Sequence, residues 1–205
     1  MLNTILVIGI GYLLGSISTG VVISKMFAKT DIRKQGSGNA GTTNMLRILG
    51  RKAALFTFIG DMLKGIIAVF IGKWLVGGEL GGLLGVVGAV LGHYYPLYFG
   101  FKGGKGIATS FGSLLFVFPI QALLAFTVFL ILVGVTHYVS VGSVAAAVTL
   151  PLLVVFTHWH DPKLWIITAC IGASVIWRHR ANIKRLMNHS ENKLDFSKLK
   201  GKKNA

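Results

Sequence analysis

Three polar clusters in the sequence contain residue types that bind negative charge. The first reads Gly-Ser-Gly-Asn-Ala-Gly-Thr-Thr-Asn from Gly36 to Asn44, and Arg47 follows three residues later. Glycines allow neighbouring backbone N–H groups to converge on an anion, and Ser, Thr and Asn side chains add hydrogen bonds. A helix that begins near Thr42 or Thr43 would add the positive end of its dipole. Taken alone, this cluster is either an anion site or a flexible glycine-rich connector.

The second cluster places two lysines among glycines. It runs from Gly92 to Thr109, and residues 99–106 read Phe-Gly-Phe-Lys-Gly-Gly-Lys-Gly. It lacks the nucleotide-binding Walker pattern, because no glycine lies five residues before Gly104 and Gly106 stands where a Ser or Thr would hold magnesium. A nucleotide is therefore not implied, but the lysines suit a phosphate or a developing oxyanion. The alternative is an interfacial loop with aromatic and lysine anchors.

The third cluster begins at Arg178 and reads Arg-His-Arg-Ala-Asn, with Arg185 beyond it. Its arginines alone would be explained as a basic stop after a membrane span. His179 and Asn182 are three residues apart, so a helix would present them on one face. A stop signal does not require that pair, which makes it a candidate for chemistry.

The composition indicates which elements must position these clusters. Of the 205 residues, 53% are hydrophobic and 13% are charged, whereas a soluble domain averages about 25% charged residues. We therefore predict an all-α, polytopic membrane helix bundle with about seven transmembrane helices. Its apolar blocks lie at about residues 3–26, 53–76, 80–99, 107–119, 120–137, 141–157 and 162–178. The fourth block is short, so a partial or re-entrant helix is the alternative there.

The basic residues predict the orientation of the bundle. With the N-terminus outside and the C-terminus in the cytoplasm, all 21 Lys and Arg except Lys64, Lys73 and Lys163 lie at or near the cytoplasmic side. All three clusters then share that face and can converge on an anion, with Asp31 as the only acid near them. Residues 1–186 are predicted to form the membrane-embedded domain, and residues 187–205 a basic, disordered tail without chemistry. A chain this apolar does not suit a nucleic-acid partner.

Two other groups of polar residues have structural explanations. Charges inside a membrane span are costly and usually paired, so Asp61 and Lys64, three residues apart, are expected to pair with each other. Their role is expected to be more structural than catalytic. His158 and His160 have a spacing that suits a metal, but loop histidines are the simpler interpretation.

The three clusters together resemble the motifs of the bacterial acyl-phosphate-dependent glycerol-3-phosphate acyltransferases, from about residue 3 to residue 187. The resemblance implies a seven-helix inner-membrane enzyme with its active site near the cytoplasmic face. It would move a fatty acyl group from acyl phosphate to the sn-1 hydroxyl of glycerol 3-phosphate, giving lysophosphatidic acid and phosphate. Membrane lipids would surround it, and the acyl-phosphate-forming enzyme is a candidate partner. No cofactor, metal or nucleotide is implied.

The resemblance also implies the site residues. Those carried over as catalytic are Ser37, Asn39, Lys105 and His179. Those carried over as substrate-binding are Thr43, Arg47, His93, Ser143 and Asn182. Further substrate-binding candidates in the first two clusters are Gly36, Gly38, Gly41, Asn44, Lys102, Gly103 and Gly104. The chain departs from the family at Ser18-Thr19 and at Thr136-His137, which leaves the geometry of those helix ends open.

The base that takes the hydroxyl proton is less defined. The chain has no histidine followed by Asp five residues later and only six acids, so the donor must be intrinsically reactive. His179 and a substrate phosphate oxygen are both candidates for the base. A transporter of organic phosphates or a lipid-binding scaffold are alternative functions, but a transporter usually binds between repeated halves, and no internal repeat is visible.

Overall fold

The computed structural model describes residues 1–194, which are helical apart from their connecting segments. The all-α prediction is therefore confirmed for this part of the chain. In order, the elements are α1 (Leu2–Gly15), α2 (Thr19–Ala28), η1 (Ile32–Lys34), α3 (Thr42–Val76), α4 (Gly78–Tyr94), η2 (Leu97–Phe99), α5 (Ile107–Leu114), α6 (Pro119–Thr136), α7 (Val139–Thr157), α8 (Pro162–Arg178) and α9 (Arg180–Met187).

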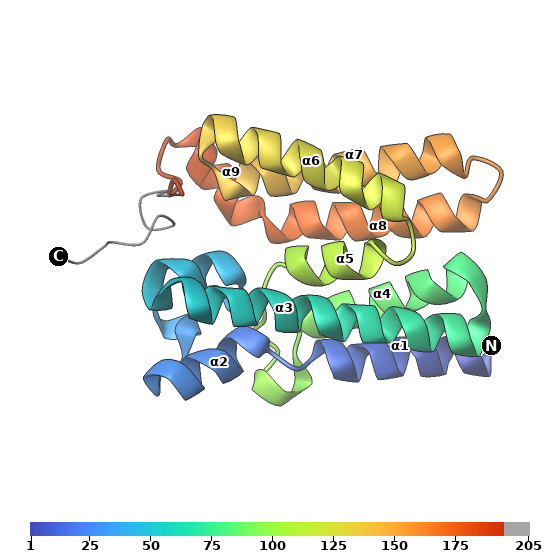
Figure 1. Cartoon of the computed structure of the whole chain (residues 1–205), viewed down its shortest axis with the longest axis horizontal. Helices are drawn as coiled ribbons and strands as arrows, with labels where there is room; N and C mark the ends of the chain where they lie inside the picture. The colour runs from blue at the N-terminus through green and yellow to red at the C-terminus, as the bar shows by residue number, and fades with distance from the viewer. Residues whose placement is uncertain (195–205) are drawn as a thin grey trace.

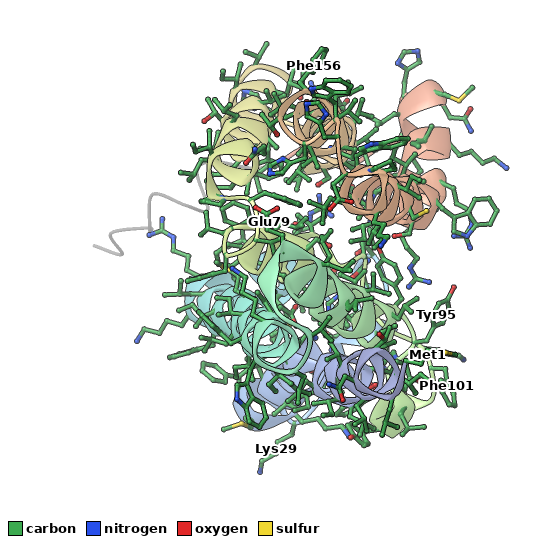
Figure 2. The ribbon with its side chains drawn as sticks, turned by 90° about the vertical axis from the view of Figure 1, so that its right-hand side faces the viewer. Met1, Lys29, Glu79, Tyr95, Phe101 and Phe156 are labelled. Atoms are coloured by element: carbon green, nitrogen blue, oxygen red, sulfur yellow. The ribbon has the colours of Figure 1, made fainter. Side chains whose placement is uncertain are left out.

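The long helices lie in two groups that α5 joins (Figure 1). Helices α1, α3 and α4 pack on one another, as do α6 with α7 and α7 with α8. The short α5 packs against α3 and α4 on one side and against α6 on the other. Figure 2 views the bundle along its length, with side chains projecting outward from both groups. The outward-facing side chains include many large apolar residues, such as Phe70, Leu130 and Phe156, as expected for a lipid-facing surface.

Glycines let α1 and α4 approach closely. A Cβ added at Gly15 would lie 2.1 Å from the carbonyl oxygen of Ala89, and one at Gly92 would lie 2.1 Å from that of Tyr12. Real Cβ atoms do not approach backbone so closely, so only glycine fits at these crossings. Helix pairs in lipid commonly use small residues in this way.

Within residues 1–194, five helical segments are long and apolar enough to cross a membrane: Leu2–Ala28, Thr42–Val76, Gly78–Phe99, Pro119–Thr136 and Val139–Thr157. The fourth predicted block corresponds to α5, whose eight residues extend only about 12 Å. Helix α5 is therefore too short to cross a membrane, in agreement with the alternative of a partial helix for the fourth block. Seven full crossings and the orientation of the termini stay predictions.

Candidate active site

The first cluster forms a loop that Asn44 organises. The Asn44 amide Nδ2 donates to the carbonyl oxygens of Gln35 at 3.0 Å and Asn39 at 3.0 Å, and Oδ1 accepts from the Ser37 N–H at 3.0 Å. Helix α3 begins at Thr42, in agreement with the predicted helix start. Gly36 has a φ of 56°, and a Cβ there would lie 2.4 Å from Asn44 Oδ1. Asn44 therefore shapes the loop, and a glycine at position 36 is required beside it.

The loop N–H groups do not converge as expected. The Gly38 N–H donates to the Gln35 carbonyl at 3.0 Å, and the Gly41 N–H donates to Asn39 Oδ1 at 2.8 Å. The prediction that these glycines supply anion-binding N–H groups is therefore wrong for this arrangement, because the loop itself uses them. The Thr42 hydroxyl is buried and has no hydrogen-bond partner among residues 1–194. Thr42 was not predicted as a site residue, but its hydroxyl can bind a ligand.

The second cluster folds back onto the end of α4. The N–H groups of Gly103 and Gly104 donate to the carbonyl oxygens of Tyr94 and His93, each at 3.2 Å. From the other side, the Arg178 guanidinium donates to the Gly104 carbonyl at 2.8 Å and lies over the Tyr94 ring, 5.2 Å from its centroid. Arg178 thus fixes the loop that carries Lys105. This role is more specific than that of a basic residue at the end of a membrane span.

The segment just before the first cluster also contacts the second cluster. Arg33 is paired with Asp31 at 2.7 Å, and its Nη1 donates to the carbonyl oxygens of Phe99 at 2.6 Å and Lys102 at 3.0 Å. A hydrogen bond to Arg33 lowers the pKa of the Asp31 carboxyl below its usual range. Asp31 and Arg33 therefore brace the two loops against each other.

Lys105 and Asn182 connect the second cluster to the third. The Lys105 Nζ donates to Asn182 Oδ1, and Asn182 Nδ2 donates to Glu191 Oε1 at 2.6 Å. Burial lowers the pKa of the Lys105 amine to about 8, although the nearby Glu191 opposes that shift. At neutral pH the lysine is therefore still mostly charged, inside a pocket where it is poorly hydrated.

His179 is held as a neutral ring with a defined tautomer. Its Nδ1 lies 2.8 Å from the Val175 carbonyl oxygen. A carbonyl only accepts, so Nδ1 carries the proton and Nε2 keeps its lone pair. Burial, with a further contribution from Lys105, lowers the pKa of the imidazole to about 4. His179 therefore accepts hydrogen bonds at Nε2 near neutral pH.

One polar pocket is lined by all three clusters and by the start of α7. Its predicted members are Ser37, Asn39, Gly41, Thr43, Asn44, Arg47, His93, Lys105, Ser143, His179 and Asn182. The predicted residues that do not line it are Gly36, Gly38, Lys102, Gly103 and Gly104. Of these, Lys102 is exposed, while the glycines shape the loops behind the pocket. The clusters thus meet at one site.

Two acids lie at this site. Asp61 and Glu191 both line the polar pocket, so the expectation that Asp31 is the only acid nearby is wrong. Glu191 accepts from Ser140 Oγ at 3.1 Å and from Arg185 Nε at 2.6 Å. Burial alone would raise the pKa of the Glu191 carboxyl, but hydrogen bonds from Asn182 and Arg185 lower it.

Glu191 was missed because it lies in the segment that was predicted to be a disordered tail without chemistry. Residues 187–194 of that segment are described, and the Arg47 guanidinium donates to the Asn192 carbonyl at 3.0 Å. The available signal was an isolated acid within a run of basic residues, nine positions after Asn182. The rest of the predicted tail, residues 195–205, lies outside the described part of the chain.

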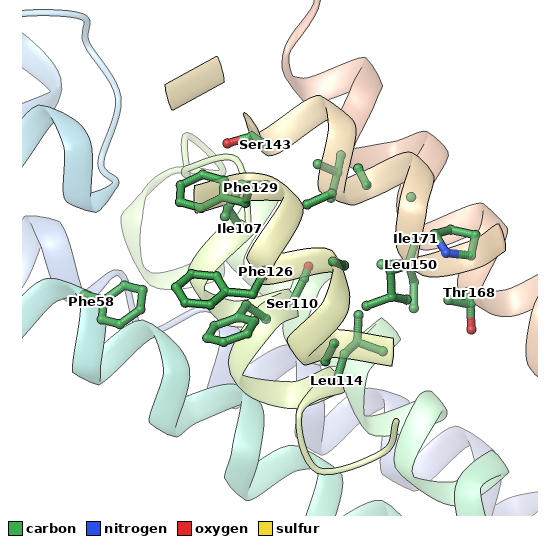
Figure 3. A pocket seen from close by; sticks show the side chains of 18 residues that line it. Phe58, Ile107, Ser110, Leu114, Phe126, Phe129, Ser143, Leu150, Thr168 and Ile171 are labelled. Carbon is green, nitrogen blue, oxygen red and sulfur yellow. The ribbon is translucent and has the colours of Figure 1, made fainter. Parts of the chain in front are cut away.

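Figure 3 shows an apolar pocket, which adjoins the polar one. It lies between α5, α6, α7 and α8, and its lining includes Leu114, Phe126, Leu150 and Ile171. Phe58, Ile107, Phe129 and Ser143 line both pockets. The two therefore share a boundary, which gives one site with a polar end and an apolar end.

A model of the family described as glycerol-3-phosphate acyltransferase matches residues 5–189. The chain belongs to the glycerol-3-phosphate acyltransferase family. A protein of that name from Clostridioides difficile (strain 630) is 45% identical over 199 residues, which cover 95% of this chain and 97% of the relative. The predicted resemblance is thus confirmed across nearly the whole length.

Two solved structures from this acyltransferase family share the fold. The crystal structure of PlsY (YgiH), an integral membrane glycerol 3-phosphate acyltransferase, in its glycerol 3-phosphate form has a TM-score of 0.87 at 37% identity, covering 96% of this chain and 98% of that one. Its lysophosphatidic acid form has a TM-score of 0.81 at 36% identity, with 96% and 97% covered. This chain is therefore an acyltransferase of the multi-pass membrane type.

Proposed function

We propose that this chain transfers a fatty acyl group from acyl phosphate to the sn-1 hydroxyl of glycerol 3-phosphate, giving lysophosphatidic acid and phosphate. The site lies near the cytoplasmic face of a bacterial inner membrane, with the C-terminus on that side. The observation that carries the proposal is the shared boundary of the polar pocket and the apolar pocket at Phe58, Ile107, Phe129 and Ser143. The phosphate group of such a substrate suits the polar pocket, and its long alkyl chain suits the apolar pocket.

The cationic residues offset the repulsion between two phosphates. Two dianions about 6 Å apart repel by about 11 kcal/mol at an effective dielectric constant of about 20. Arg47 and Lys105 face the polar pocket from different elements, so each can bind a phosphate. Lys105, with Asn182, holds the glycerol phosphate, and the hydroxyls of Ser37 and Thr43 with the Asn39 amide bind the head of the acyl phosphate.

The reaction is a direct acyl transfer. The sn-1 oxygen attacks the acyl carbonyl carbon, the bond from that carbon to the phosphate oxygen breaks, and inorganic phosphate leaves. A base must take the hydroxyl proton. With a pKa of about 4, His179 is poorly matched to that task near neutral pH, whereas a phosphate oxygen has a second pKa of about 6. The proton therefore passes to phosphate, and His179 Nε2 orients the glycerol by accepting from its sn-2 hydroxyl.

Purified protein in lipid nanodiscs tests this function and donor. It is given labelled glycerol 3-phosphate with either acyl phosphate or acyl-CoA, and lysophosphatidic acid and phosphate are measured. We expect both products in equal amounts with acyl phosphate and neither with acyl-CoA. Absence of product with either donor would contradict the activity, and equal use of acyl-CoA would contradict the proposed donor.

A further inference from the structure

A buried cluster of charged and polar groups lies behind the loop that carries Lys105. Asp61 and Lys64 on α3 pair at 2.9 Å, which confirms the predicted pairing. His93 on α4 lies beside them, with its Nδ1 2.9 Å from Lys64 Nζ and 3.5 Å from Asp61 Oδ1. All three side chains are at most 6% exposed. An isolated structural ion pair would not need the imidazole as a third member.

The hydrogen bonds of Lys64 decide which nitrogen of His93 is the acceptor. An ammonium group has three N–H donors and accepts none. Lys64 Nζ hydrogen-bonds to the Ile17 carbonyl oxygen and to His93 Nδ1, each at 2.9 Å. It also lies 2.9 Å from Asp61 Oδ1 as an ion pair, although that oxygen has no hydrogen-bond partner among residues 1–194. His93 Nδ1 must then be the acceptor, so the proton of the neutral ring lies on Nε2. Thr109 Oγ1, at 3.3 Å from the same nitrogen, can donate to it as well.

The opposite side of the His93 ring contacts the lysine loop. A Cβ added at Gly104 would lie 2.2 Å from His93 Nε2, so the ring lies directly against the loop backbone. The Gly104 N–H also donates to the His93 carbonyl at 3.2 Å. His93 lines the polar pocket together with Lys105. The ring therefore lies between Lys64 and the loop that carries Lys105.

We propose that Asp61 and Lys64 are positioning residues that hold the His93 ring in its Nε2–H tautomer. In that form the His93 ring supports the loop that carries Lys105, and its Nε2–H donates to a phosphate in the polar pocket. Asp61 balances the charge of Lys64 inside the membrane. Lys64 in turn fixes which nitrogen of His93 donates. This inference rests on the proposed acyltransferase function, but it assigns a role to two residues that are not among the predicted site residues.

Magnetic resonance of the protein with 15N-labelled histidine tests the tautomer in the absence of substrates. The His93 signal is assigned by its loss in a His93→Gln variant. We expect a protonated Nε2 and an unprotonated Nδ1. A protonated Nδ1 would overturn the proposal, whether or not the acyltransferase assay succeeds.

Kinetics of a double variant test the positioning role. Replacing a buried ion pair by apolar residues of similar volume often preserves folding, whereas removing one partner leaves an unpaired charge. In Asp61→Leu/Lys64→Met we expect the KM for glycerol 3-phosphate to rise about tenfold or more, with a smaller change in kcat. Wild-type kinetics in the folded double variant would overturn the positioning role.

Two further variants keep this test decisive. Gln121 is a buried polar residue that donates to Thr157 at 2.9 Å and lines neither pocket, so Gln121→Leu serves as the control and should keep wild-type kinetics. Gly104→Ala would displace the His93 ring while leaving the ion pair intact. If the double variant fails to fold, the same rise in KM in Gly104→Ala supports the proposal, and an unchanged KM overturns it. Inactive wild-type protein would instead contradict the proposed function.

Discussion

Lys105 has the environment that most changes its own chemistry. It is buried at the junction of the second and third clusters, its Nζ donates to Asn182, and burial lowers the pKa of its amine to about 8. Its charge is therefore sensitive to mildly alkaline pH, while an arginine would keep its charge throughout. A lysine in this position makes the affinity for an anionic substrate depend on pH.

Lys105 gives a prediction about activity at alkaline pH. Because the amine is protonated below its pKa of about 8, the KM for glycerol 3-phosphate should rise as pH increases through that value. In Lys105→Arg this rise should move to higher pH, and Lys105→Ala should lose about tenfold or more of turnover at neutral pH. Initial rates measured from about pH 6 to about pH 10 test this. Near-normal turnover of Lys105→Ala would contradict its role.

His179 gives a prediction about both catalysis and stability. Its pKa is lowered from 6.5 to about 4, so the unfolded chain binds the proton more readily and stability should fall as pH decreases through that interval. In His179→Gln this loss should be smaller, because no ring is left to charge. The variant should also keep most of its turnover if phosphate is the base. Thermal unfolding and initial rates measure the two effects, and loss of nearly all turnover would favour His179 as the base.

The residues of the site were predictable to different degrees. Lys105, His179 and Asn182 could be found because cations and a His–Asn pair stand beside apolar segments, where composition alone does not require them. The role of Asn44 could not be predicted, since the sequence does not distinguish an amide that binds substrate from one that binds its own loop. Glu191 was also missed, because its value comes from hydrogen bonds with Ser140, Asn182 and Arg185 that only the fold brings together.

At the scale of elements, α5 is too short to cross a membrane but lies where both helix groups meet (Figure 1). It carries Ile107 at the boundary of the two pockets and Leu114 deeper in the apolar one. The sequence predicted a short fourth block, because a span requires about 20 apolar residues. It did not predict that this block forms one wall of an apolar pocket, which depends on how α6, α7 and α8 pack around it.

Filling the apolar pocket should change which donors are used. Ala146 lines that pocket, so Ala146→Phe should raise the KM for long-chain acyl phosphates about fivefold or more and affect short-chain donors less. The KM for glycerol 3-phosphate should not change. Ile120→Phe is a matched control, since Ile120 is 68% exposed and lies outside both pockets. Equal effects on all chain lengths would contradict acyl binding there.

The contact between α1 and α4 gives a matched pair of stability predictions. Gly15→Ala places a methyl group against the Ala89 carbonyl and should destabilise the bundle by about 1–3 kcal/mol. Gly9→Ala on the same helix meets no atom within 4 Å and should be neutral or stabilise by up to about 1 kcal/mol. Unfolding in detergent measures both, and similar effects would contradict close packing of the two helices.

At the scale of the whole molecule, the net charge of +15 is distributed unevenly along the chain. The basic residues predicted one face for all three clusters, and the convergence of those clusters at one pocket agrees with that argument. The number of crossings was harder to predict. Apolar blocks identify helices, but α5 shows that an apolar helix need not cross the membrane.

Thiol labelling tests the orientation of the bundle. In a Cys170→Ala background, which removes the one cysteine, Lys34→Cys and Glu79→Cys place single thiols near opposite ends of the bundle. With the N-terminus outside, an impermeant reagent applied to intact spheroplasts should label position 79 and leave position 34 unlabelled until the membrane is opened. The reverse pattern would contradict the predicted topology.

The boundary shared by the two pockets determines how molecules would enter and leave during the proposed reaction. Glycerol 3-phosphate and released phosphate dissolve in water, whereas an alkyl chain seated beside Phe126 and Leu150 lies between two helices that are apolar enough to cross a membrane. The lysophospholipid can then leave sideways into the leaflet, without passing its tail through water. Turnover should therefore respond to the fluidity of the surrounding lipid as well as to the chemistry of the pocket.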